Sequence, residues 1–199
     1  MTGVALESLT ALLSCQRQQE SALKPIDKAA LQTMVDTTAK ELLIPGVVVV
    51  LRTPQGEFTV SYGTTLLGAT SLPGADTHFR IASNTKTMTA AVIVLLAQDG
   101  GKLSLDDPVS KYVPDVPNGD KITITELLNM RSGLYTYDDD PDFWAVLERE
   151  PAKVWSPAEV LAIAFKHPPY FPPGTGYHYS NTNYALLRFL SNGRPRSNP

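Results

Sequence analysis

The fold is decided by residues 83–97, which read Ser-Asn-Thr-Lys-Thr-Met-Thr-Ala-Ala-Val-Ile-Val-Leu-Leu-Ala. From Ala90 to Ala97 the segment is apolar without a break, which predicts a buried helix that Ser83 begins. Lys86 follows one turn later, on the same face of that helix. A serine hydroxyl needs a neighbouring base to act as a nucleophile at neutral pH, and a lysine at this spacing can be that base. The Ser83 backbone N–H, at the helix start, is free to help hold an oxyanion.

The spacing of a serine and a lysine three residues apart is weak evidence when it stands alone. It fits a helix cap followed by a solvated lysine equally well. Ser21-Ala22-Leu23-Lys24 has the same spacing, but a proline follows at once and no apolar helix begins there. Only Ser83 follows a strand-like lead and enters a helix, so its context distinguishes it from this second example.

A second polar motif, Tyr179-Ser180-Asn181, follows a turn-rich stretch and precedes apolar residues that predict another helix. A phenolate near a lysine ammonium can act as a general base, and an asparagine amide can orient the lysine or a substrate carbonyl. Alone, the triplet is better explained as a hydrogen-bonded loop corner. Its presence downstream of Ser83 and Lys86 favours a catalytic interpretation of both motifs.

Four segments occur in a fixed order between residues 27 and 187. They are FRIASNTK (79–86), LSLDDPV (103–109), ITELL with RSGL (124–128 and 131–134), and Pro173-Gly174 leading to Tyr179-Ser180-Asn181. Together they resemble the serine β-lactamase and penicillin-binding-protein family, in its class C and DD-peptidase-like branch. The resemblance implies an α/β (α+β) fold of the β-lactamase/DD-peptidase type, with an antiparallel sheet flanked by helices beside a helical region.

The resemblance also implies a role for each polar residue. Ser83 would be the acylated nucleophile, Lys86 its base partner, and Tyr179 a second base for acylation or for the hydrolytic water. Asn181 would bind the amide side chain of the substrate. The implied substrate is a small molecule or a peptidoglycan-like D-amino-acid peptide, a β-lactam or an ester, with no metal and no organic cofactor. Carboxypeptidase, β-lactamase and esterase activities all remain open.

Members of this family carry a K-T-G or H-x-G motif on a strand beyond the tyrosine, and the sequence has none after Tyr179. Residues 188–199 are instead rich in Arg, Ser, Asn and Pro, a composition typical of disorder. We therefore expect a domain over 27–187 without its C-terminal sheet strands, an irregular tail over 188–199, and a truncated or frame-shifted copy. A catalytically incompetent remnant, or a non-catalytic binding module of the same fold, is the alternative hypothesis.

A valine-rich segment at 46–52 and a second segment at 58–62, joined through Pro54-Gln55-Gly56, predict a β-hairpin. A two-stranded hairpin is marginally stable and leaves a valine-rich edge unpaired. This edge predicts low stability, aggregation or self-association. Cap signals predict helices from Asp27 to Leu43, and at about 124–130 and 157–166.

The composition excludes several classes of protein. The net charge of −3 gives no sign of nucleic-acid binding, and no apolar run is long enough to span a bilayer. The run Asp138-Asp139-Asp140 is better explained as a solvated loop and helix start than as a metal site, because no histidine lies at ligand spacing.

Residues 1–26 are expected to be a leader or disordered. Their Leu12-Leu13-Ser14-Cys15 faintly resembles a lipoprotein cleavage box, but no Lys or Arg precedes it, and an ordinary lone thiol is the better explanation. The family resemblance suggests a location outside the cytoplasm.

Overall fold

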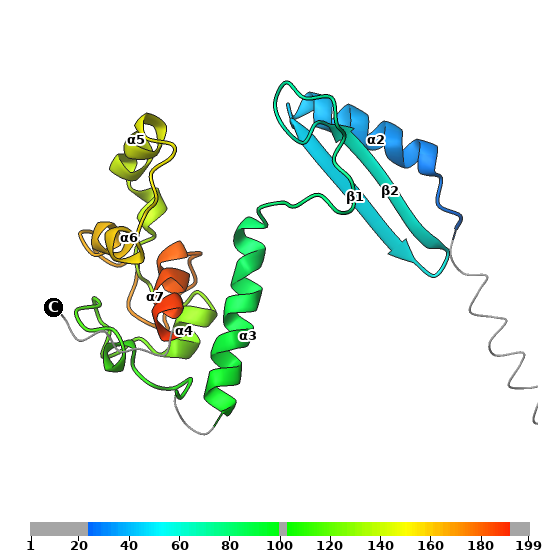
Figure 1. Cartoon of the computed structure of the whole chain (residues 1–199). Coiled ribbons are helices and arrows are strands. Elements are labelled where there is room, and N and C mark those ends of the chain that lie inside the picture. Colours follow the sequence, from blue (N-terminus) through cyan, green and yellow to red (C-terminus); the bar gives the residue numbers. More distant parts are fainter. Residues whose placement is uncertain (1–23, 100–102, 192–199) are drawn as a thin grey trace, which may run out of the picture. The chain divides into compact units, whose positions relative to one another are not determined.

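The structure is a computed structural model that describes residues 24–99 and 103–191 (Figure 1). These residues form six α-helices and one two-stranded antiparallel sheet, so the fold is mixed α/β as expected. The chain divides into two compact units, Met1–Arg80 and Ile81–Pro199. The elements are α2 (Lys28–Glu41), β1 (Gly46–Thr53), β2 (Gly56–Gly63), α3 (Thr85–Gln98), α4 (Ile124–Leu128), α5 (Pro141–Arg149), α6 (Pro157–Ala164) and α7 (Asn181–Ser191), with short 3₁₀ turns η1 (Ala82–Asn84), η2 (Val109–Lys111) and η3 (Tyr137–Asp139).

The first unit confirms the predicted hairpin. The pairing of β1 with β2 runs from Gly46 opposite Gly63 to Thr53 opposite Gly56. Gly63 has φ +75°, and a side chain there would meet the Pro45 carbonyl oxygen at 2.1 Å, so only glycine fits at the end of β2 that lies opposite the start of β1.

Helix α2 lies along this hairpin (Figure 1). Its N-cap is Asp27, whose carboxylate accepts hydrogen bonds from the backbone N–H groups of Ala29 and Ala30. The helix ends at Glu41, slightly before the predicted Leu43, which adopts a positive φ. Between helix and strand, Gln32 Nε2 donates to the Ser61 carbonyl oxygen at 2.9 Å. The cap signal in the sequence therefore placed the start of the helix correctly.

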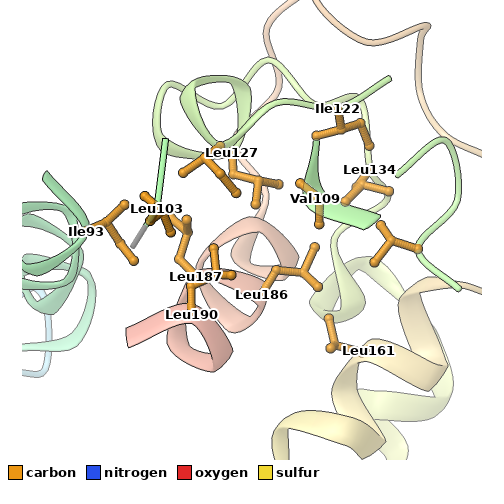
Figure 2. Close-up of a cluster of buried hydrophobic side chains, with 12 residues drawn as sticks. Ile93, Leu103, Val109, Ile122, Leu127, Leu134, Leu161, Leu186, Leu187 and Leu190 are labelled. Atoms are coloured by element: carbon orange, nitrogen blue, oxygen red, sulfur yellow. The ribbon is translucent and has the colours of Figure 1, made fainter. Parts of the chain in front are cut away.

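The core of the second unit is centred on α7. This helix contacts α3, α4 and α6, and Figure 2 shows its leucines pointing into one cluster with side chains from those neighbours. The buried members are Ile93, Leu103, Val109, Val116, Ile122, Ile124, Leu127, Leu134, Leu161, Leu186, Leu187 and Leu190. The first residue of α7 is Asn181, so the same packing fixes a residue of the second motif.

The expectation that the helix after Ser83 is buried is wrong for this unit. Of the residues in α3 only Ile93 is buried, whereas Met88 and Leu95 are each more than 60% exposed. The apolar run covers the whole circumference of the helix, but the unit packs against only the side that carries Ile93. In addition, Ser83 lies in η1, and α3 itself begins at Thr85.

Both predicted capping boxes are confirmed. Thr123 begins α4 and Ser156 begins α6, and in each case the side chain and backbone N–H exchange hydrogen bonds with a glutamate three residues on. The two helices end at Leu128 and Ala164, slightly earlier than predicted. None of the described helices is long and apolar enough to cross a membrane.

Helix α7 continues through Ser191, so residues 188–191 are helical where an irregular tail was expected. The remainder of that tail lies outside the described residues. The same is true of residues 1–23, which hold most of the expected leader and Cys15. The proposed domain over 27–187 stays a prediction.

Candidate active site

Ser83 is presented by an unusual backbone turn. Ala82, immediately before it, has φ +43°, a left-handed conformation that is costly for a residue with a side chain. The turn leaves Ser83 exposed and places Lys86 in the first turn of α3. No hydrogen bond within the described residues uses the Ser83 backbone N–H. This N–H is therefore available to a ligand oxygen.

The structure brings all four predicted site residues together within the second unit. Lys86 Nζ donates to Ser83 Oγ at 3.0 Å, and the Tyr179 hydroxyl lies 2.7 Å from the same oxygen. Lys86 Nζ also donates to Asn181 Oδ1 at 2.6 Å. The nucleophile candidate thus lies within hydrogen-bond distance of two titratable groups, which is the arrangement that an acyl-transfer site requires.

The surroundings of Tyr179 lower the pKa of its phenol. Desolvation and the charge of Asp138 raise this pKa, but hydrogen bonds with Lys86 and Ser83 and the charge of Lys86 together lower it below its ordinary value. The ammonium of Lys86 lies 4.8 Å from the centre of the Tyr179 ring. A lowered pKa increases the fraction of phenolate near neutral pH, and the phenolate can accept the Ser83 proton.

Each carboxylate of the acidic run has a different partner, which the sequence did not reveal. Asp138 accepts from Asn181 Nδ2 at 2.7 Å, and Asp139 accepts from the Tyr170 hydroxyl at 2.5 Å. Asp140 caps α5 and lies 2.7 Å from His167 Nε2. The hydrogen bond with His167 is the largest of the causes that lower the pKa of Asp140. In the part of the chain that the structure describes, no cluster of three or more acidic, histidine or cysteine side chains is suited to a metal ion.

Asp138 is the site residue that sequence reasoning missed. The sequence predicts a solvated loop for Asp138 and its two acidic neighbours, and nothing local links Asp138 to a residue 43 positions away. The one local feature near Asp138 is the pair Asp140 and Pro141, which indicates the start of a helix and not a contact with Asn181.

A cavity of about 350 Å³ adjoins the pair formed by Lys86 and Asn181. Its walls include the aromatic rings of Tyr137, Trp155 and Tyr184. Neither Ser83 nor Tyr179 lines it. The cavity therefore adjoins Lys86 and Asn181 and not the candidate nucleophile.

Comparison with known proteins agrees with this geometry. The model of the family described as beta-lactamase matches residues 31–194. Protein flp from Staphylococcus aureus strain N315 is 36% identical over 119 residues, which are 57% of this chain and 22% of that protein. Penicillin-binding protein 4* from Bacillus subtilis strain 168 is 28% identical over 172 residues, which are 84% of this chain and 36% of that protein.

A solved structure is also similar. A D-stereospecific amidohydrolase from Streptomyces sp. superposes with a TM-score of 0.71 and 34% sequence identity, over 85% of this chain and 51% of the other. The chain therefore spans about a fifth to about a half of the length of these relatives.

Proposed function

We propose, on the premise that the chain belongs to the beta-lactamase family, that its function is the hydrolysis of an amide or ester through an acyl-enzyme on Ser83. The observation that carries this proposal is the position of Ser83 Oγ, which contacts both Lys86 Nζ and the Tyr179 oxygen. A serine that only capped a helix would accept a hydrogen bond from a backbone N–H. The Ser83 hydroxyl instead contacts two titratable side chains.

The chemistry follows from these contacts. The Tyr179 phenolate takes the Ser83 proton as Oγ forms a bond to the substrate carbonyl carbon, and the carbonyl electrons move onto its oxygen. The Ser83 backbone N–H stabilises this oxyanion, and Lys86 stabilises the phenolate by its charge. The intermediate then collapses, and the leaving amine or alcohol takes the proton from Tyr179. Water attacks the resulting ester in the same way and releases Ser83.

A D-configured amide is the substrate class that the relatives favour. The similar solved structure is named a D-stereospecific amidohydrolase, and another relative is named a penicillin-binding protein. β-Lactams and simple esters are the other substrates that the same acylation step accommodates. All three place a carbonyl carbon within reach of one serine oxygen, so a common acylation assay covers them.

A non-catalytic binding module of the same fold is the second candidate. It is favoured by one observation, that the cavity is lined by Lys86 and Asn181 and not by Ser83 or Tyr179. Such a module would hold a ligand in this cavity without forming a bond to Ser83.

Intact-protein mass spectrometry separates these candidates. The chain is incubated with benzylpenicillin and, in parallel, with p-nitrophenyl acetate, and any adduct is mapped by peptide sequencing. The hydrolase predicts an adduct on Ser83 that is lost in Ser83→Ala and retained in Ser21→Ala, which has the same serine–lysine spacing. A folded chain that gains no adduct from either reagent would reject the hydrolase and leave the binding module.

A further inference from the structure

We infer that Asp138 is a positioning residue that fixes the side-chain amide of Asn181 and thereby decides which of its atoms face Lys86 and a ligand. The inference rests on the proposed function, because it concerns residues that support the Ser83 nucleophile. It adds a residue that neither the motifs nor their spacing identifies.

The orientation of the Asn181 amide follows from its two charged neighbours. Lys86 Nζ lies 2.6 Å from Asn181 Oδ1, and Asp138 Oδ2 lies 2.7 Å from Asn181 Nδ2. An ammonium only donates hydrogen bonds and a carboxylate only accepts them. A flipped amide would place donor against donor and acceptor against acceptor, so only one orientation satisfies both neighbours.

Asp138 is itself held in place by groups on both sides. The Thr136 hydroxyl donates to Asp138 Oδ1 and accepts from the Asn181 backbone N–H, the latter at 2.9 Å. Trp144 Nε1 donates to the Asp138 carbonyl oxygen at 2.6 Å. The carboxylate is therefore tied both to the loop that carries it and to the first residue of α7.

Neighbouring hydrogen bonds join the same two elements. The Tyr137 backbone N–H donates to Thr182 Oγ1 at 3.1 Å, and that hydroxyl donates to the Tyr135 carbonyl oxygen at 2.7 Å. Thr182 is fully buried, so these bonds are protected from water. The loop and the start of α7 thus form one rigid support, on which Asp138 supplies the negative charge.

This arrangement limits what Asn181 can offer a ligand. A primary amide has two N–H donors, and Asp138 takes one of them. The other is left for a ligand carbonyl oxygen, while Oδ1 stays committed to Lys86. Without Asp138 the amide is held only by its hydrogen bond with Lys86, and the alignment of Lys86 with Ser83 loses part of its support from Asn181.

The first test measures the Asn181 amide directly by nuclear magnetic resonance of the ¹⁵N-labelled full chain. The two side-chain N–H signals are assigned from their loss in Asn181→Asp. In Asp138→Ala they should move to the positions of an unrestrained asparagine. Asp139→Ala is the matched control, since Asp139 accepts from Tyr170 and not from Asn181. Asn181 signals that stay in place in Asp138→Ala, or that move equally in the control, would overturn the inference.

The second test measures the rate of Ser83 acylation by p-nitrophenyl acetate. Asp138→Ala should lower the rate about tenfold or more in a chain that remains folded. Asp138→Asn should restore part of the rate, because its side-chain oxygen can still accept from Asn181. A wild-type rate in a folded Asp138→Ala chain contradicts the inference. If the wild-type chain is not acylated at all, the proposed function fails, and the amide signals still decide the role of Asp138.

Discussion

Tyr179 is subject to opposing influences on its phenol. Desolvation and the charge of Asp138 favour the neutral phenol, whereas the hydrogen bonds with Lys86 and Ser83 and the charge of Lys86 favour the phenolate and prevail, so the pKa of Tyr179 is lowered. Because the folded pKa lies below the ordinary value of 10.0, the phenolate fraction rises with pH through a range below 10. A base that works as phenolate therefore makes the reaction faster as the pH rises through that range.

Tyr179→Phe tests this base. The substitution keeps the ring near Lys86 and removes only the oxygen that contacts Ser83. We expect the acylation rate to fall by about 10² to 10⁴, the usual contribution of a general base, and the rise of rate with pH to disappear. The measurement is a pH–rate profile of p-nitrophenol release. Tyr177→Phe, in an exposed neighbour, should leave the profile unchanged, and a wild-type profile in Tyr179→Phe would assign the base role to Lys86 alone.

Asp107 provides a pH-dependent contribution to stability elsewhere in the second unit. Hydrogen bonds from Lys111, Tyr112 and the Ser104 backbone N–H, in that order, lower the pKa of Asp107 from 3.8 to about 2. A lowered folded pKa means that the ionised form stabilises the fold. The contribution is complete above the unfolded pKa of about 4 and is lost as the pH falls through about 2.

Asp107→Asn should therefore destabilise the chain at neutral pH and have little effect near pH 2. Urea unfolding midpoints of the variant and the wild type, measured from pH 7 down to pH 2, should converge as the acid is protonated. The adjacent Asp106→Asn is the matched control, because its exposed side chain has no hydrogen bond to the residues that the structure describes. Midpoints that stay equally far apart at pH 2 would show that the Asn side chain acts through packing and not through charge.

At the scale of elements, the sequence predicted those features that depend on nearby residues. The hairpin and the capping boxes at Thr123 and Ser156 follow from local chemistry, and the structure confirms them. The exposure of α3 was not predictable, because an apolar run does not specify how many of its sides are packed. The positive φ of Ala82 is set by the whole turn, since nothing in an alanine favours it. The partner of Asp138 was equally hidden, because tertiary contact alone brings it to Asn181.

The hairpin itself predicts self-association. In the described residues β1 pairs with β2 alone, so the outer edges of both strands keep unsatisfied backbone groups. Val50, which is 39% exposed, lies in the valine-rich strand β1. We expect Val50→Lys to reduce association, because a charge on an edge strand disfavours pairing with another chain. Sedimentation velocity over a range of concentrations measures this.

Val154→Lys is the control for that experiment, because Val154 is an exposed valine outside any strand. It adds the same charge without changing the edge. Association that persists unchanged in Val50→Lys, or that falls equally in both variants, would show that the strand edge is not the contact.

At the scale of the whole molecule, the site depends on the core that joins its elements. Ser83 and Lys86 belong to η1 and α3, Asn181 is the first residue of α7, and Tyr179 lies two residues before it. Ile93 of α3 and Leu187 of α7 lie in the same buried cluster (Figure 2). The contact between the two helices therefore sets the distance between the two motifs, and loss of core packing should affect stability and acylation together.

Leu187→Ala tests this dependence. The side chain is fully buried, and removal of such a leucine typically costs about 2 to 5 kcal/mol in the free energy of unfolding. We expect a lower urea midpoint and, under conditions where the variant remains folded, slower acylation of Ser83, because α7 carries Asn181. Leu43→Ala, at a position that is 87% exposed, should change neither quantity. A destabilised Leu187→Ala chain that acylates at the wild-type rate would show that the two motifs keep their alignment without the shared core, through the hydrogen bonds between Lys86 and Asn181 and between Tyr179 and Ser83 alone.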